Sequence, residues 1–210
     1  YIPYVEAILK QMDGNIWKKP GEDIPIETAE GPAAVKEAIA HLKKQKPVGS
    51  LTLEQPMTKA AKVHVDDIGP KGLDGHDGSD GSGPSDRIER FCQWDVTVGE
   101  NIDFGGKTGQ DSVISFIIDD GVDGRGHRTN LFNPEFKIIG ISVGAHTTFD
   151  RCLVVTFAGG IVGKATNNNA DKSAPADSKK GQAADSKPAD SKKGQAADSK
   201  PAADTKKEDP

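Results

Sequence analysis

One carboxylate is notable because its position conflicts with its charge. In the segment Val96–Phe104, apolar and polar residues alternate as in a strand with one face on a core, and Glu100 falls on the apolar side. The residues that share its parity are Val96, Val98, Ile102 and Phe104. An ionised carboxylate is costly to bury alone, so hydrogen-bond donors, a cation or a metal ion should face it. A salt bridge to Arg87, Arg125 or Arg128 is the simplest arrangement.

The histidines are the second group that could do chemistry. His76 and His127 lie in glycine-rich segments, where an imidazole can approach a ligand or a metal ion without crowding. His64 instead falls in the apolar stripe of a predicted helix, so we expect it in the core. His41 falls on the polar side of another helix and is expected in solvent. We assign no role to His146.

The elements that must position these residues are a mixture of helices and strands. The predicted helices are Pro3–Met12, Pro32–Lys46, Gln55–Ile68 and Gln110–Asp120, and the predicted strands are Val96–Phe104, Lys137–His146 and Cys152–Ala158. The last two strands are joined by a short polar connection that is typical of an antiparallel hairpin. The segments Pro20–Gly31 and Gly69–Gly83 are predicted loops. Helices around a few strands predict an α+β domain with a small, mainly antiparallel sheet.

Several short motifs in a fixed order resemble one known family. The first two are Ala60-Ala61-x-x-His64 and Gly75-His76-x-Gly78-Ser79-Asp80-Gly81-Ser82-x-Pro84-x-x-Arg87-Ile88. They are followed by Gly99-Glu100-Asn101-Ile102, Gly126-His127-Arg128-x-Asn130-Leu131-Phe132-Asn133-Pro134 and Ile139-Gly140-Ile141. Their order and spacing are similar to the CAP superfamily of cysteine-rich secretory, antigen 5 and pathogenesis-related 1 proteins, also called SCP domains. The resemblance extends from about Ala33 to Gly160.

This resemblance implies an α-β-α sandwich with a cleft that is lined by histidines and acids. Carried over by motif, the cleft residues are His76, Glu100 and His127. The family's second cleft acid has no clear match, although Asp119, Asp120 and Asp123 precede the Gly-His-Arg motif. That departure resembles the microbial or protist-like type of the domain. The accessory cleft residues are then Asp77, Asp120 and Arg128.

A carboxylate with two imidazoles is a known zinc ligand set, so we predict that His76, Glu100 and His127 hold Zn²⁺ or another divalent cation. Ca²⁺ is the less favoured ion. Asp74, Asp77 and Asp80 recur in the glycine-rich loop, but an EF-hand needs acids at every second position and a later bidentate Glu.

The two cysteines, Cys92 and Cys152, leave two alternatives open. They are either buried free thiols, which behave as small hydrophobic residues, or a disulfide. The resemblance to secreted proteins and the even count favour a Cys92–Cys152 disulfide. Free thiols would instead favour an intracellular location.

Composition divides the 210-residue chain in two and excludes some partners. The segment Ala176–Pro188 is followed by an identical copy, Ala189–Pro201, and residues 163–210 lack core-forming side chains. We therefore predict a domain over residues 1–162 and a disordered tail over residues 163–210.

The net charge is −5 without a basic patch, which argues against nucleic-acid binding. No apolar run is long enough to cross a membrane. The chain opens on Tyr1 without a signal segment, and Tyr1–Tyr4 resembles part of the family's first helix, so we expect an N-terminal truncation.

Together these features predict a secreted CAP-type binding module with an unknown protein or a lipid or sterol as its ligand, rather than an enzyme. Two alternatives stay open. One is a metal-assisted hydrolase of peptides or esters that uses the same cleft, and the other is a structural partner domain with a vestigial cleft.

Overall fold

A four-stranded sheet is the central element of the computed structural model, which describes residues 1–164. Its strand order is β4 (Thr52–Leu53), β6 (Ile138–His146), β7 (Asp150–Lys164) and β5 (Cys92–Phe104). β6, β7 and β5 are antiparallel neighbours, and β4 is parallel to β6. The predicted hairpin is therefore present as β6–β7. β5 forms one edge of the sheet, which matters because it carries Glu100.

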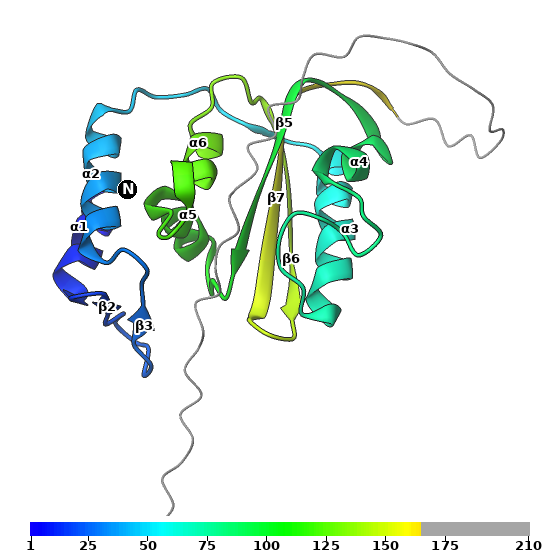
Figure 1. The fold of residues 1–210 in the computed structure, drawn as a ribbon. Coiled ribbons are helices and arrows are strands. Elements are labelled where there is room, and N and C mark those ends of the chain that lie inside the picture. The colour runs from blue at the N-terminus through cyan, green and yellow to red at the C-terminus, as the bar shows by residue number, and fades with distance from the viewer. Residues whose placement is uncertain (165–210) are drawn as a thin grey trace, which may run out of the picture.

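Helices cover both faces of this sheet (Figure 1). α3 (Gln55–Lys71) and α4 (Pro84–Glu89) lie on one side, and α5 (Gly109–Ile118), the short 3₁₀ turn η1 (Asp123–Arg125) and α6 (Gly126–Leu131) lie on the other. The predicted α+β sandwich is confirmed. Helix α3 approaches β6 closely because Gly140 has no side chain: a Cβ atom there would lie 2.1 Å from the backbone carbon of Met57.

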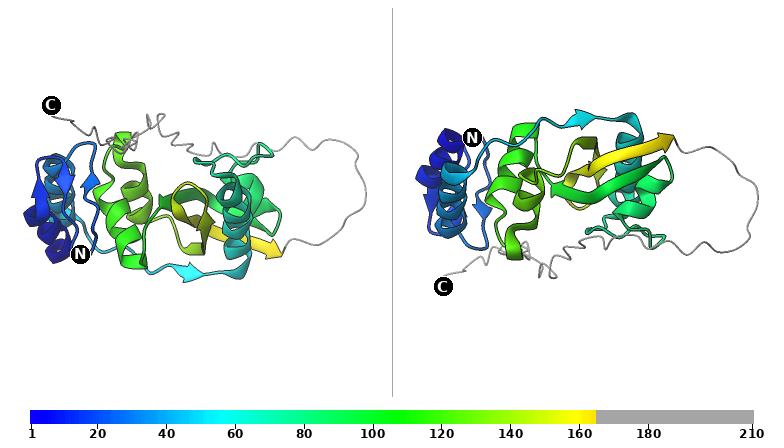
Figure 2. Two further views of the ribbon diagram at one scale, coloured as in Figure 1. Left: turned by 90° about the horizontal axis from the view of Figure 1, so that it is seen from below. Right: turned by 90° about the horizontal axis from the view of Figure 1, so that it is seen from above.

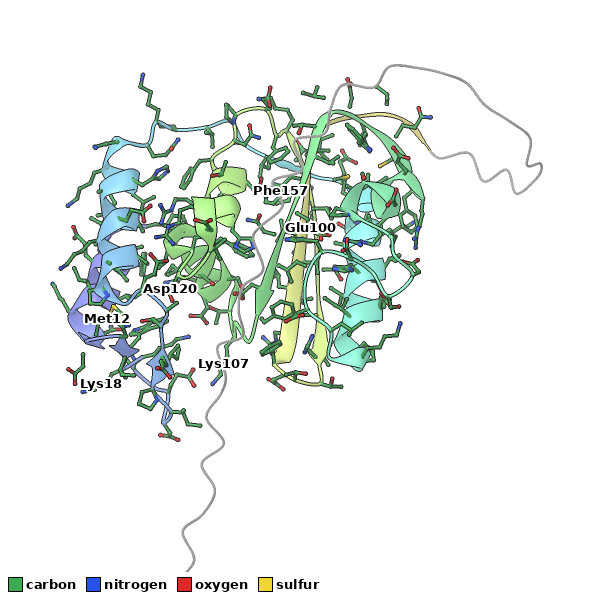
Figure 3. The ribbon with its side chains drawn as sticks, viewed as in Figure 1. Met12, Lys18, Glu100, Lys107, Asp120 and Phe157 are labelled. Atoms are coloured by element: carbon green, nitrogen blue, oxygen red, sulfur yellow. The ribbon has the colours of Figure 1, made fainter. Side chains whose placement is uncertain are left out.

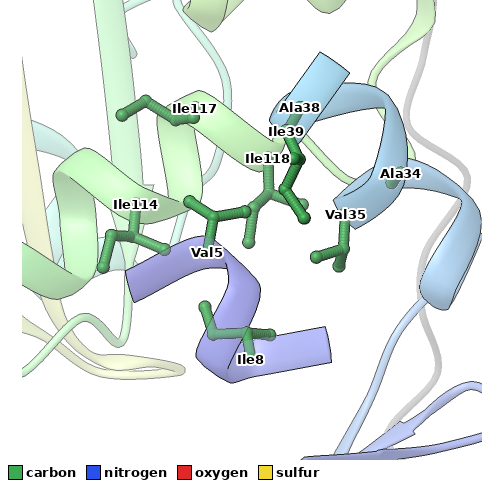
Figure 4. Close-up of a cluster of buried hydrophobic side chains, with 9 residues drawn as sticks. All are labelled: Val5, Ile8, Ala34, Val35, Ala38, Ile39, Ile114, Ile117 and Ile118. Carbon is green, nitrogen blue, oxygen red and sulfur yellow. The ribbon is translucent and has the colours of Figure 1, made fainter. Parts of the chain in front are cut away.

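The N-terminal elements form a further layer beyond α5. They are α1 (Ile2–Gln11), a small sheet of β1 (Met12–Asp13), β2 (Ile16–Trp17) and β3 (Ile26–Glu27), and α2 (Pro32–Lys44). Figure 2 shows the same order of layers from above and below: α1 and α2, then α5, then the sheet, then α3. The apolar side chains of α1, α2 and α5 meet in one cluster, which Figure 4 shows with Val5, Val35 and Ile117.

Several element boundaries differ from the prediction. β3 lies inside the predicted loop Pro20–Gly31, while α4 and α6 are six-residue helices, too short to show a helical period. β5 and β7 are longer than predicted, and β7 runs into the first two residues of the predicted tail. In β5, an irregular register between Asp95 and Val98 breaks the alternation, so Val96 is 64% exposed with φ 68° instead of facing the core.

The predicted Cys92–Cys152 disulfide is wrong. Both cysteines are buried free thiols. Cys152 pairs across the sheet with Phe104, at one end of β5, and Cys92 pairs with Lys164, at the other. At a strand rise of about 3.3 Å per residue, the two ends lie roughly 35–40 Å apart, whereas a disulfide needs Cα atoms within about 7 Å. Two long antiparallel strands therefore separate the thiols.

The predicted disordered tail lies outside the described residues from residue 165 onward. Among the helices of residues 1–164, none has the length and apolar composition needed to span a membrane.

Candidate functional site

Glu100 is buried in the middle of the fold, as its position in the strand predicted. Its side chain is 1% exposed and lies on β5 between the two helical layers (Figure 3). Nη2 of Arg87 lies 2.9 Å from each carboxylate oxygen, so Arg87 is the cation among the three that were expected. Arg87 comes from α4 and also donates to the carbonyl of Ser82 at 2.6 Å. Burial alone would raise the pKa of Glu100, but the hydrogen bond with His76 and the charge of Arg87 together hold that pKa below its usual value.

His76 is bound to the same carboxylate. Its Nδ1 lies 3.0 Å from Oε1 of Glu100, and its side chain is 27% exposed. The loop that carries His76 is anchored by His64, whose Nε2 lies 2.9 Å from the carbonyl of Gly75. His64 is fully buried, as predicted, and burial lowers its pKa. The carboxylate therefore fixes Nδ1 of His76 and leaves Nε2 as the nitrogen that can meet a ligand.

His127 is held by a different acid, Asp119. Its Nδ1 lies 2.7 Å from Oδ1 of Asp119, and Oδ2 of the same carboxylate accepts the backbone N–H of Arg128 at 3.0 Å. The His127 ring also packs on Phe116, with centroids 5.4 Å apart. Asp119 ends α5 in the left-handed conformation (φ 56°), which aims its buried carboxylate at the start of α6.

Asp119 is the site residue that sequence reasoning missed. Asp119 does not match the position of the family's second cleft glutamate, and an aspartate at a helix end also has an ordinary role as a cap. The available signal was the spacing along the chain. Asp119 lies where one helix ends, only eight residues before His127 at the start of the next helix, so a short turn can bring the two side chains together.

Two of the three predicted accessory residues, Asp120 and Arg128, brace the elements around the site. Asp120 accepts the backbone N–H groups of Ala29 and Glu30 at 2.6 and 2.9 Å, which ties the N-terminal layer to the end of α5. Arg128 is buried and donates to the carbonyls of Ile117 and Ile118 and to Glu37. Asp77 is exposed on the loop beside His76.

The two histidines attach to opposite faces of β5. Glu100 and Asn101 are consecutive strand residues, so their side chains point to opposite sides. Glu100 binds His76, while Nδ2 of Asn101 donates to the carbonyl of His127 at 2.9 Å. Because β5 is an edge strand, a route between the two faces runs around it rather than through the sheet.

The chemistry of this donor set fits a metal ion in one respect. Each imidazole has Nδ1 on a buried carboxylate, the arrangement by which proteins orient histidine ligands and raise their basicity. In the part of the chain that the structure describes, however, no group of three or more His, Cys, Asp or Glu residues is arranged to hold a metal ion. The residues therefore offer two oriented nitrogens but no complete ligand shell.

A sheet covered on both faces by helices, with a histidine–carboxylate pair on each side of its edge strand, defines the class of domain that the motifs indicated. The chain belongs to the CAP family: the model of the cysteine-rich secretory protein family matches residues 36–157. The match begins inside α2, so Tyr1–Tyr4 and the whole of α1 lie before the matched region.

Three known proteins illustrate how far the similarity extends. The uncharacterized protein YkwD of Bacillus subtilis is 30% identical over 91 residues, which cover 43% of this chain and 34% of that protein. The match thus spans about a third of that relative's length. An extracellular protein containing an SCP domain from Bacillus anthracis is 20% identical, with a TM-score of 0.44 over 59% of this chain and 38% of that one. An outer surface protein of Borrelia burgdorferi is 20% identical, with a TM-score of 0.46 over 60% and 88% of the two chains.

Proposed function

We propose that this CAP domain is a secreted binding module whose cleft holds a divalent cation, such as Zn²⁺, between Nε2 of His76 and Nε2 of His127. The observation that carries the proposal is that each ring has Nδ1 committed to a buried carboxylate, Glu100 or Asp119. Both rings are partly exposed, at 27% and 20% of the side chain, so an ion from solvent can reach them. The family's secretory members support the extracellular location.

In this proposal Glu100 orients the metal ligand His76 and does not bind the metal ion itself. Both of its oxygens contact Arg87, and one also contacts His76. Direct ligation would have to break that buried ion pair, which is costly because Arg87 would lose its partner. Two protein nitrogens are fewer than the three or four of most zinc sites, so water completes the shell and we expect weak binding.

The geometry favours a binding module over a metal-assisted hydrolase. A hydrolase needs a base that can take a proton from a metal-bound water. Glu100 is closed off from solvent and paired with Arg87, and Asp119 is buried under His127 and Arg128. Both carboxylates are thus engaged by protein partners, which disfavours either of them as the base. The ligand that the module recognises, a protein or a lipid or sterol, is then bound without turnover.

Calorimetric titration of the metal-free full chain with Zn²⁺ tests the metal proposal. We expect one weak site, with at least tenfold lower affinity in both His76→Ala and His127→Ala. His41→Ala is the matched control, because His41 lies on α2 and packs on Phe132, outside the cleft. Unchanged binding in the cleft variants would place the ion elsewhere, such as the Asp74–Asp80 loop.

Assays with ester and peptide substrates test the class of function. A binding module predicts no turnover above that of the Glu100→Gln variant, with or without Zn²⁺. Turnover that requires both Zn²⁺ and Glu100 would contradict the module and establish the hydrolase.

A further inference from the structure

A cavity of about 550 Å³ lies between the N-terminal layer and the sheet, in the range of sites that hold small molecules. One wall comes from residues that precede the region matched by the CAP family, including Ile8, Met12 and Trp17. The opposite wall comes from β5 and α5, including Asp103, Ile114 and Phe116. Figure 4 shows Ile8 of α1 and Ile114 of α5 near one another. The cavity is therefore built by this chain's own N-terminal elements together with the family's core.

Most of the cavity wall is apolar, but carboxylates are grouped in one part of it. Those that already have partners are Asp111, which pairs with Lys19 at 2.8 Å, Asp119, which pairs with His127, and Asp120, which accepts backbone N–H groups. A fourth lining acid, Glu27, belongs to the exposed strand β3.

Asp103 is the exception. It is 8% exposed, and its Oδ2 accepts the hydroxyl of Ser112 at 2.7 Å. No lysine or arginine within residues 1–164 forms an ion pair with it. Burial raises the pKa of Asp103 even though the hydroxyls of Ser112 and Ser115 lower it. A desolvated carboxylate without a cation is stabilised by any positive charge that reaches it.

We propose that this cavity binds a small amphipathic cation, with a protonated amine on Asp103 and an apolar body against Met12, Trp17 and Ile114. The apolar wall supplies the burial and Asp103 supplies the charge that selects the ligand. The cavity adjoins the His127 half of the proposed metal site, because Asp119 and His127 are also among its lining residues, but the amine contacts Asp103 and not Nε2 of either histidine. The amine site can therefore be present even if Zn²⁺ does not bind.

Trp17 provides the readout, because it is one of two tryptophans and lies in the cavity wall. In the full chain with Trp94→Phe, titration with octylammonium should change the Trp17 emission and saturate. Octanol and octanoate carry the same apolar chain without the positive charge, so we expect each to bind at least tenfold more weakly. Asp103→Asn keeps an oxygen acceptor for Ser112 and should remove the preference for octylammonium.

Two further variants separate recognition in the cavity from general effects. Asp66→Asn, on the outer surface of α3, removes one negative charge elsewhere and should leave the preference intact. Ala7→Phe places a ring in the cavity from α1 without a change of charge and should weaken all three compounds. Equal binding of octanol and octylammonium, an unchanged preference in Asp103→Asn, or the absence of any saturable change would each overturn the proposal.

Discussion

Nδ1 of His127 lies 2.7 Å from Oδ1 of Asp119, although His127 lies in the first turn of the short helix α6 and Asp119 caps the end of helix α5. The second oxygen of Asp119 accepts the N–H of Arg128, so one carboxylate holds both the imidazole and the first turn of its helix. The orientation of His127 is therefore set by the end of α5.

Asp119→Asn tests this dependence. Asparagine tolerates the left-handed backbone at residue 119, so the fold should be kept, but a neutral amide polarises the imidazole less. If the proposed metal site is correct, Zn²⁺ affinity should fall about 10–100-fold in calorimetry. Asp120→Asn is the control, because Asp120 contacts backbone N–H groups of the N-terminal layer. Equal losses in both variants would mean that the effect is one of general stability.

The buried pair of Arg87 and Glu100 should show strong coupling in stability. Arg87→Met leaves a buried carboxylate with only the two histidines, His76 at 3.0 Å and His64 at 4.0 Å, beside it, which we expect to cost about 3–5 kcal/mol of unfolding free energy. Adding Glu100→Gln removes the uncompensated charge, so the double variant should be more stable than Arg87→Met alone. Urea denaturation of the wild type, both single variants and the double variant measures this, and additive losses would contradict it.

Gly140 should not tolerate a side chain. A Cβ atom would lie 2.1 Å from the backbone carbon of Met57, so α3 would have to move away from β6. We expect Gly140→Ala to cost about 1–3 kcal/mol or more, the range for an overpacked core. The matched control is Gly109→Ala at the start of α5, where a Cβ meets no atom within 4 Å. A thermal midpoint in Gly140→Ala equal to that of the control would contradict the close packing.

Glu30 should contribute an acid-sensitive part of the stability. A hydrogen bond from Arg125 lowers the pKa of Glu30 from 4.5 to about 2. The folded state thus holds the ionised form more strongly than the unfolded state, so this stability is present above pH 4.5 and is lost as the pH falls toward 2. Because the pair is partly exposed, we expect Glu30→Gln to cost only about 1 kcal/mol at neutral pH and almost nothing near pH 2.

Thermal unfolding from pH 7 to pH 2 measures this difference. Glu135→Gln is the control, because Glu135 is an exposed glutamate that forms no ion pair within residues 1–164. A loss in Glu30→Gln that is the same at every pH would show that the carboxylate's charge is not what matters.

The burial of Glu100 was predictable because alternation in a strand is a local property. The same rule was wrong at Val96, since a register irregularity depends on the partner strand, and β7 lies more than fifty positions later. The choice of Arg87 over Arg125 and Arg128 was not predictable from the strand. It depends on α4, which is too short to show a pattern and is placed by its contacts with α3 and β5.

The His127 half of the site was harder to predict, because it also depends on where short elements end and how they pack. His127 was identified by its motif, but its acid is set by where α5 ends and how the chain turns into α6. At the cysteines, in contrast, the sequence predicted a contact that the structure does not contain. An even count and a secreted family favoured a bond, while the pairing of β5 with β7 places the two thiols at opposite ends of the sheet.

The contacts around the two histidines differ greatly in how far they reach along the chain. Glu100 binds His76 and Arg87 across 24 and 13 residues, whereas Arg125 binds Glu37 and Glu30 across 88 and 95 residues. Because closing a longer loop costs more chain entropy and slows folding, the His76 side can form early, from one short stretch of chain. The Asp119–His127 pair spans only eight residues, so it can form early as well. Only the anchoring of Arg125 by Glu30 and Glu37 has to wait until the N-terminal layer docks, so η1 and the start of α6 should become protected from hydrogen exchange later than the loop that carries His76.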